Sequence, residues 1–315
     1  MRPVLLLVLA TAGWGLSFPV AKAAGLAQEA LLPGYATWFH SAVQLFLRFG
    51  IAAGLLAIWQ CTRLHRFTRL EWQQGASLGG FAAAGCLLQV DGLAYTHAST
   101  SAFLTQFTCV LVPIWAAWEH RRFPGTRVIT SVLIVLAGVA LLARFDWRTL
   151  ELGRGELETL GCAVFFTGQI FVLERPRFYA NNSGRVSLVM FATAAALLLP
   201  ICLAGARHPA DVFAPLESGP VLALLALLVV ICTLGSYLLM NHWQPRVTPT
   251  HAGLIYCCEP LFASVLAVFL PGMFAVLAGV AYANESPGWE LLAGGTLITL
   301  ANLLMVLPRR HANQG

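Results

Sequence analysis

Ten apolar segments, each close to the length that crosses a lipid bilayer, run through this 315-residue chain. A membrane-spanning helix needs about 20 mostly apolar residues. Hydrophobic residues make up 58% of the sequence and charged residues only 10%, and no polar stretch is long enough to fold alone. These features exclude an ordinary soluble domain and predict an all-α integral membrane protein. The predicted spans are residues 4–24, 38–60, 75–96, 99–118, 128–144, 156–174, 187–205, 219–243, 250–271 and 290–308.

The polar stretch from Phe145 to Gly155 divides the ten segments into two sets of five. Residues 1–144 are predicted to form a first five-helix repeat, 145–155 a connecting loop and 156–315 a second five-helix repeat. Because five is odd, the second repeat starts on the opposite side of the membrane and is inverted. Inverted repeats are typical of transporters that give alternating access to a site between the halves.

Positive charges collect in alternate connections. If the N-terminus is cytoplasmic, the connections on that side hold 13 of the 19 Lys and Arg residues, and the outer connections hold four. This bias predicts that both termini are cytoplasmic. The net charge of +5 is spread over the loops, so it indicates orientation and not a nucleic-acid surface. The inner set is Arg2, Arg63, Arg66, Arg69, Arg121, Arg122, Arg127, Arg175, Arg177, Arg185, Arg246, Arg309 and Arg310, and the outer set is Arg144, Arg148, Arg154 and Arg207.

The first apolar stretch could also pass for a signal peptide, because Arg2 precedes a short apolar run. The stretch continues to Ala24, which is long enough to span, so we favour a retained helix. The eight cysteines lie almost entirely inside apolar segments and lack metal-ligand spacing. We therefore interpret them as small buried residues and expect no metal and no cofactor.

Glycines repeat at intervals of four on two of the predicted helices. Gly50 and Gly54 share one face of the second segment, and Gly75 and Gly79 share one face of the third. Small residues in this pattern predict close contact between helices in lipid.

A proline lies in the middle of both the fourth and the ninth segment, at Pro113 and Pro260. Proline removes a backbone donor and frees a carbonyl one turn earlier, which protein or a water-filled cavity must satisfy. Helix interruptions in corresponding places of two repeats point to a binding site. A purely structural kink is the alternative.

Glu259 is the sharpest single candidate for a functional residue. It lies nine residues inside the ninth segment, or roughly 13 Å at the 1.5 Å rise of a helix, near the midplane of the membrane. An ionisable group at that depth is costly and is normally tied to a partner, an ion or a proton pathway. Glu259 could bind the coupling proton or a cationic substrate group. A structural salt bridge or a protonated, hydrogen-bonded carboxyl is the alternative.

Polar side chains on several other spans could complete a cavity around Glu259. Each one alone is more often an interhelical hydrogen bond, but their presence on many spans favours a polar cavity. Arg48 and Lys22 also lie within spans, where Arg48 could pair with a carboxylate and Lys22 could reach the outer headgroups. We interpret both as structural. The candidates for substrate binding are Trp14, Ser17, Gln89, Gln106, Gln169, Tyr237, Asn241 and Tyr256, and Asp91, Tyr95, Thr105 and Gln244 lie near them in the sequence.

Catalytic motifs are absent from the sequence. It contains no HExxH, no GxSxG and no Gly-rich phosphate loop. His97 with Ser99 and Ser101, or His242 with His251, could be imagined in an intramembrane hydrolase, but no carboxylate spacing supports a triad. We predict no catalytic residue and no ATP-driven pump, which leaves gradient-coupled transport or facilitated diffusion.

Four stretches of the sequence resemble the EamA-type transporters of the drug/metabolite transporter superfamily. They are Gly13-Trp-Gly-Leu-Ser-Phe18, Leu47-Arg-Phe49, the junction from Leu93 to Thr105, and the run from Gln244 to Pro260. Their order and spacing cover both halves of the chain. The resemblance implies ten helices in an inverted five-plus-five repeat around a central cavity, with Glu259-Pro260 as the ninth-helix motif and Val112-Pro113 in its first-half counterpart.

The sequence departs from that family after Phe269, since Glu285 arrives about ten residues later than the family's usual helix end. The apolar stretch from Met273 to Tyr282, within the insertion 272–289, either extends the ninth helix beyond a kink or lies at the outer surface.

The resemblance implies a permease of the inner (plasma) membrane that moves a small polar metabolite and works by alternating access. We expect a proton-coupled exporter, with amino acids among the candidate substrates, that acts as a monomer or homodimer in the lipid bilayer without nucleic acid. An uncoupled facilitator or importer is the alternative within the superfamily. A channel-like scaffold and an intramembrane enzyme are alternatives outside it. Glu259 ranks first among the expected site residues, followed by Trp14, Gln106, Asn241 and Tyr256.

Overall fold

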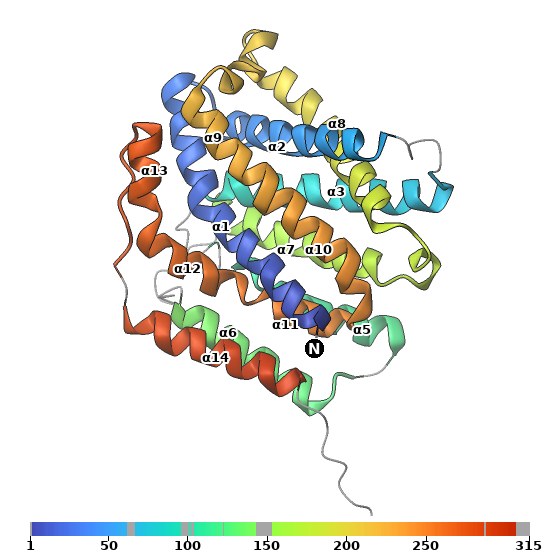
Figure 1. The fold of residues 1–315 in the computed structure, drawn as a ribbon. Helices are drawn as coiled ribbons and strands as arrows, with labels where there is room; N and C mark the ends of the chain where they lie inside the picture. Colours follow the sequence, from blue (N-terminus) through green and yellow to red (C-terminus); the bar gives the residue numbers. More distant parts are fainter. Residues whose placement is uncertain are drawn as a thin grey trace, which may run out of the picture.

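The computed structural model describes residues 2–61, 67–95, 101, 104–121, 123–142, 153–286 and 288–306, and every regular element in them is a helix (Figure 1). The helices are α1 (Arg2–Leu31), α2 (Thr37–Trp59), α3 (Arg69–Gly92), α5 (Thr108–His120), α6 (Thr126–Leu142), α7 (Arg154–Leu173), α8 (Ser183–Gly205), α9 (Gly219–Leu227), α10 (Ser236–Trp243), α11 (Pro249–Tyr256), α12 (Glu259–Phe269), α13 (Pro271–Ala278) and α14 (Trp289–Val306). Short connecting helices are η2 (Pro176–Phe178), η3 (Pro209–Val212), η4 (Ala214–Leu216), the π-helix η5 (Leu228–Gly235) and η6 (Gln244–Arg246).

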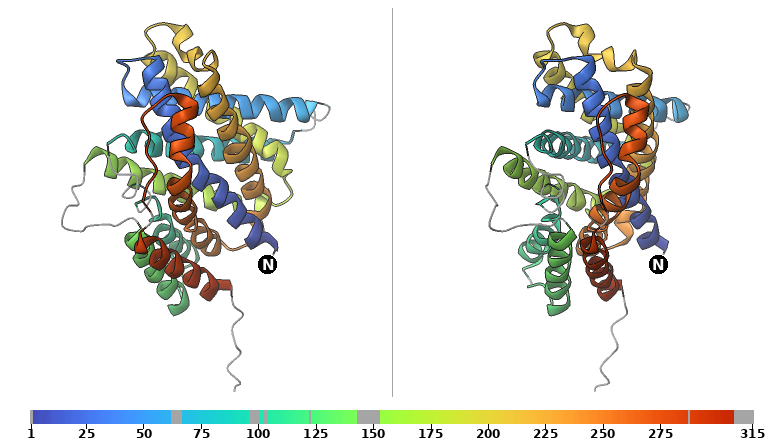
Figure 2. Two further views of the ribbon diagram at one scale, coloured as in Figure 1. Left: turned by 60° about the vertical axis from the view of Figure 1, so that its left-hand side comes forward. Right: turned by 90° about the vertical axis from the view of Figure 1, so that its left-hand side faces the viewer.

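Six helical stretches are long and apolar enough to cross a membrane, so the chain is a multi-pass membrane protein. The other four predicted spans coincide with α3 and with the shorter apolar helices α5, α6 and α14, and their crossing stays a prediction. The beginning of α1 and the end of α14 lie at the same end of the molecule (Figure 2). The six stretches are Arg2–Leu31, Thr37–Trp59, Arg154–Leu173, Ser183–Gly205, Gly219–Arg246 and Pro249–Phe269.

Helices of the first half pack mainly against helices of the second half. α3 lies along α7 and α8, α2 lies along α8, α1 lies along α9, α10 and α12, and α6 lies along α14 (Figures 1 and 2). The first segment is one continuous helix with fully buried residues such as Leu7 and Ala10. The two halves of the sequence are therefore interleaved in space.

The glycine repeats differ in their packing. A Cβ on Gly75 would lie 2.5 Å from the Val189 Cβ, and one on Gly79 would lie 2.5 Å from the Met190 carbonyl oxygen, so α3 and α8 touch through these glycines. A Cβ on Gly54 would have no neighbour within 4 Å, so the prediction of close contact there is wrong.

Several helix boundaries differ from the prediction for local reasons. α3 starts at Arg69 and not at residue 75, because Thr68 and Glu71 form a capping box at its N-terminus. The eighth segment contains the π-helix η5, and the ninth segment is broken at Cys257–Cys258 between α11 and α12. The first-half break comes at residues 106–107, and α5 is continuous through Pro113. The prediction that Pro113 itself interrupts a helix is therefore wrong.

The insertion 272–289 extends the ninth helical stretch beyond a kink, which is the first of the two alternatives. α13 begins at Pro271, directly after α12, and ends at Gly279 with φ of 66° (Figure 1). The chain then returns alongside, where the Asn284 side chain accepts a hydrogen bond from the Gly272 backbone at 2.6 Å. The Glu285 backbone N–H donates to the Ala267 carbonyl at 3.0 Å.

Candidate functional site

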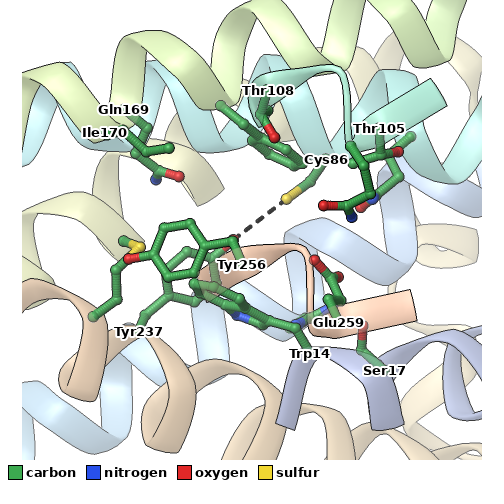
Figure 3. Close-up of a pocket in the computed structure, with 15 residues that line it drawn as sticks. Trp14, Ser17, Cys86, Thr105, Thr108, Gln169, Ile170, Tyr237, Tyr256 and Glu259 are labelled. Atoms are coloured by element: carbon green, nitrogen blue, oxygen red, sulfur yellow. Dashed lines mark hydrogen bonds between the residues drawn. The ribbon is translucent and has the colours of Figure 1, made fainter. Parts of the chain in front are cut away.

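A cavity lies between the two halves of the sequence (Figure 3). The space open to the centres of water molecules is about 70 Å³, several times the roughly 10–15 Å³ that one water needs. Side chains from α1, α2, α3, α7, α10, α11 and α12 and from the segment around the start of α5 line it. They are Trp14, Ser17, Arg48, Cys86, Gln89, Thr105, Gln106, Thr108, Phe166, Gln169, Ile170, Tyr237, Met240, Tyr256 and Glu259.

Seven of the eight predicted substrate-binding residues line this cavity together with Glu259. Asn241 is the exception, because its amide points to α8, where it donates to Ser187 Oγ at 2.8 Å and approaches Met190 Sδ at 3.5 Å. Asn241 lies one helical turn after Tyr237, so we expected both side chains in the cavity. At Asn241, however, this face of α10 packs against α8. Pro113 and Pro260 are not part of the lining.

Three aromatic rings form one wall of the cavity. Trp14 meets Tyr237 and Tyr256 edge to face, with ring centroids 5.3 Å apart in both pairs. Tyr256 donates its hydroxyl to Gln244 Oε1 at 2.6 Å, and the fully buried Gln244 donates to the Ile170 carbonyl at 3.0 Å. These bonds fix the position of the Tyr256 ring. Gln244 therefore supports the cavity from behind.

Glu259 occupies the first residue of α12, directly after the break at Cys257–Cys258. The positive end of a helix dipole favours a negative charge at that position. The side chain lies beside Trp14 and is partly accessible from the cavity (Figure 3). The broken helix thus presents a carboxyl group to the cavity.

Arg48 contributes the opposite charge to the same lining. Its side chain is 6% exposed, and the guanidinium donates to Thr233 Oγ1 at 2.5 Å and to the Cys232 carbonyl at 3.0 Å. Both acceptors belong to η5, and π-helical turns are frequent at functional sites. We expected Arg48 to pair with a carboxylate, but its partners are a hydroxyl and a backbone carbonyl. We expected Arg48 to be structural, but it lines the cavity. An ionisable residue in the middle of a span already indicates a functional site.

Three polar atoms of the lining residues have no hydrogen-bond partner among the described residues. They are the indole nitrogen of Trp14, the amide nitrogen of Gln89 and the amide oxygen of Gln106. A buried polar group without a partner costs free energy, so these groups are available to a polar ligand. Two are donors and one is an acceptor.

Other polar candidates lie away from the cavity. Asp91 forms an ion pair with Arg154 at 2.5 Å. Lys22 is exposed and lies over the Tyr282 ring at 5.5 Å. Ser101 shares a hydrogen bond of 3.2 Å with Thr159 and faces no histidine in the described part of the chain.

The hydrolase and metal alternatives gain no support from the described residues. His97 and Ser99 lie outside the described residues, and His242 pairs through Nδ1 with Ser183 at 3.0 Å. Across the described ranges, no three His, Cys, Asp or Glu side chains gather as a metal site would require. No disulfide joins any of the eight cysteines, and all but Cys61 are buried.

Comparison with known proteins shows what the sequence and the fold resemble. Residues 1–144 match the sequence model of the EamA-like transporter family. The uncharacterized inner membrane transporter YicL of Salmonella typhimurium (strain LT2) is 25% identical over 214 residues, which is 67% of this chain and 64%, less than two thirds, of that relative. A protein of known crystal structure is similar in fold with a TM-score of 0.68 at 15% identity, over 97% of this chain and 96% of that one.

Proposed function

We propose that the chain is a secondary transporter of the EamA type that moves a small metabolite through the cavity between its halves. The match of residues 1–144 to the EamA-like transporter family and the likeness to an inner membrane transporter support this proposal. The observation that carries the proposal is the set of unpartnered polar atoms on Trp14, Gln89 and Gln106 in one lining. A cavity kept only for packing would have no reason to leave them unpaired.

The charges of the lining support a zwitterionic substrate, such as an amino acid. Glu259 and Arg48 supply one negative and one positive group to the same cavity, and no ion pair joins them in the described residues. A purely cationic ligand would give Arg48 no oppositely charged partner, and a purely anionic ligand would give Glu259 none. An ammonium group near Glu259 and a carboxylate near Arg48 satisfy both. The edge of the Trp14 ring and the tyrosines would then contact the rest of the molecule.

Proton-coupled export follows from the same carboxyl group. Glu259 can hold either a proton or the ammonium group of a substrate, but the two compete for one site. Release of substrate on protonation, followed by inward release of the proton, gives exchange of the metabolite for protons. An uncoupled facilitator would lack this competition.

The arrangement of helices supports the ten-span, inverted-repeat topology. The packing of α3 on α7 has a counterpart in α1 on α9 and α10, which is the pair obtained when the two halves are exchanged. The family match ends at residue 144, where the predicted first repeat ends. Together with the positive charges of the alternate loops, this supports both termini on the cytoplasmic side of the inner membrane.

A metabolite screen tests the proposal. Overexpression is expected to lower the cellular content of one zwitterionic compound and to raise it in the medium. Purified protein in liposomes is then expected to show saturable counterflow of that compound. Counterflow distinguishes a mobile site from a channel, and a screen in which no compound changes its distribution would reject the proposal. Ser101→Ala should transport normally, whereas an enzyme that uses this residue would lose activity.

A further inference from the structure

We propose that access to the cavity changes by movement along a seam that does not follow the two sequence halves. The helices α2, α3, α7 and α8, which we call the clamped body, stay together, and the remaining helices move against them. The inference rests on the proposed function, because only a transporter needs such a movement. It assigns roles to polar residues at the two ends of the clamped body that lie outside the cavity.

At one end of the clamped body, α2 and α3 are fastened to the start of α8. Glu71 on α3 is buried and forms an ion pair with Arg185 at 2.9 Å. The same carboxylate accepts the Asn182 backbone N–H at 3.0 Å. Gln60, at the end of α2, donates to the Gly184 carbonyl at 3.0 Å. Separating a buried carboxylate from its cationic partner and its backbone donor costs free energy, because the charge would be left buried and unpaired.

At the other end, α3 is fastened to α7 and α2. Asp91, whose side chain is 5% exposed, pairs with Arg154 Nη2 at 2.5 Å and accepts the Thr37 hydroxyl at 3.0 Å. The Arg154 guanidinium also lies over the Tyr95 ring, 4.3 Å from its centre. α3 is thus held by charged groups at both of its ends.

At this second end, hydrogen bonds also join the segment before α2 to the segment after α8. The Tyr35 hydroxyl, just before α2, donates to Asp211 and accepts the Arg207 backbone N–H at 2.9 Å. The Arg207 side chain donates to the Gly34 carbonyl at 2.6 Å. The connection after α8 is therefore tied to the connection before α2.

Between the two ends, glycines let the backbone of α3 lie directly against α8 and α7. Added Cβ atoms on Gly75 and Gly79 of α3 would collide with α8, and one on Gly85 would lie 2.7 Å from the Phe166 ring of α7. Helices that touch this closely cannot slide without clashes. Since α2 and α3 belong to the first half and α7 and α8 to the second, the halves cannot separate as units.

The contacts across the seam are of a different kind. Cys86 of α3 meets the Tyr237 hydroxyl at 3.6 Å, Ser101 meets Thr159 at 3.2 Å, and Thr105 lies 3.9 Å from Cys162 Sγ. Asn241 of α10 donates to Ser187 of α8 at 2.8 Å, and Gln244 of η6 donates to the Ile170 carbonyl of α7 at 3.0 Å. These are single bonds between neutral groups, which exchange for water or substrate at small net cost. Arg48 is the exception, because its guanidinium reaches across the seam to two acceptors on η5 through charge-assisted hydrogen bonds. Both acceptors are neutral, so water or a substrate carboxylate can take their place when the helices move.

The seam also passes through the cavity. Arg48, Cys86 and Gln169 belong to the clamped body, whereas Trp14, Tyr237 and Glu259 belong to the moving helices. Movement along the seam therefore separates the two charges of the lining, and it opens the cavity without breaking the ion pairs Glu71–Arg185 and Asp91–Arg154.

Disulfide locks test this division. The pair Gly50→Cys/Ala195→Cys joins α2 to α8 inside the clamped body, where a Cβ on Gly50 would lie 3.9 Å from the Ala195 Cβ, within the range that a disulfide spans. Thr105→Cys lies next to native Cys162 and joins the two sides of the seam. Ser101→Cys/Thr159→Cys supplies a second seam lock. Each lock is formed with copper phenanthroline and verified by mass spectrometry.

The readout needs no substrate. Alkylation of Cys86, in the cavity lining, by a membrane-impermeant maleimide is measured by mass spectrometry in right-side-out and in inverted vesicles. Without a lock, labelling from both faces is expected, and labelling from one face alone would count against the proposed function itself. The oxidised clamped-body lock should keep at least half of the labelling rate from both faces. The oxidised seam locks should lower the rate from one face at least tenfold, and reduction should restore it.

Two results would overturn the inference. One is loss of labelling from either face when the clamped-body lock is oxidised. The other is labelling that continues at the unlocked rate from both faces when the seam locks are oxidised.

Discussion

At the scale of single residues, the cavity depends on a few polar groups that the surrounding helices hold in place. Arg48 is the least exposed charge in the lining, and its two hydrogen bonds to Thr233 and Cys232 keep the π-helix η5 against α2. Tyr237 follows η5 by two residues, so the same bonds position one ring of the aromatic wall.

Replacement of Arg48 by alanine is expected to destabilise the protein by about 2–3 kcal/mol, because it removes two charge-assisted hydrogen bonds and leaves their acceptors unpaired. The measurement is the unfolding free energy in detergent, with Lys22→Ala as the control. Lys22 is exposed and contacts only the Tyr282 ring in the described residues, so its loss should cost less than about 1 kcal/mol. Equal effects of the two substitutions would contradict this role of Arg48.

The stability that Asp211 contributes in the connection after α8 depends on pH. The hydrogen bond from the Tyr35 hydroxyl, and then that from the His208 backbone, lower the pKa of Asp211 below its ordinary value of 3.8. A lowered carboxyl pKa stabilises the folded protein above the ordinary pKa, and this stabilisation is lost as the pH falls through the lowered pKa.

Asp211→Asn is therefore expected to lower the melting temperature at pH 7, and the difference from the wild type should shrink at pH values below the ordinary pKa of 3.8. The control is Glu217→Gln, an exposed carboxylate on the same connection. A difference that is the same at neutral and acidic pH would show that the Asp211 charge does not act through this contact.

At the scale of helices, close approach through glycine decides which helices form one body. Gly79 and Gly80 are neighbours on α3, but a Cβ on Gly79 would lie 2.5 Å from the Met190 carbonyl oxygen, whereas one on Gly80 would meet nothing within 4 Å. The two positions form a matched pair with the same backbone and the same substitution.

Gly79→Ala is expected to destabilise the protein by roughly 1–3 kcal/mol through overpacking. Gly80→Ala should be neutral or stabilising by up to about 1 kcal/mol, since alanine favours the helix over glycine. Thermal unfolding of both variants in one detergent checks the pair. Similar melting temperatures for the two would contradict the close contact of α3 with α8.

The sequence predicted the helical segments well because apolar length is a strong local signal. It placed the start of α3 six residues late, because the mixed polar turn from Arg69 to Gln74 hides a helix that begins at a capping box. It did not reveal η5, since a π-helix leaves no trace in hydropathy. The interruption predicted at Pro260 does occur, but it lies just before that residue, at Cys257–Cys258, and Pro260 is the second residue of α12.

The same reasoning explains the one predicted cavity residue that faces elsewhere. Asn241 and Tyr237 are four residues apart on one helix, which predicts a shared face. Their side chains nevertheless reach different neighbours, because α8 lies close enough to Asn241 to receive its amide. Helix spacing gives the face of a residue, whereas its neighbour depends on how the other helices pack.

At the scale of the whole molecule, interleaving of the halves is the property that gives the site its composition. The cavity lining combines helices from both halves, and the two charges come from α2 and α12, on opposite sides of the seam. In the proposed inverted repeat the two halves supply corresponding helices, but only the second half carries a carboxylate at the helix break. Glu259 is therefore the residue on which coupling of protons to the metabolite depends in this account.

Proton movement driven by substrate tests this account most directly. The protein is reconstituted in liposomes that contain a pH-sensitive dye, and a gradient of the compound identified by the metabolite screen is applied. Wild-type protein is expected to move protons against the substrate flux. Glu259→Gln should lose substrate-driven proton flux at least tenfold while retaining counterflow at saturating substrate, with a raised half-saturation concentration because the ammonium group loses its charged partner. If Glu259→Gln moves protons at the wild-type rate with unchanged pH dependence, Glu259 is not the coupling site and the central claim is contradicted.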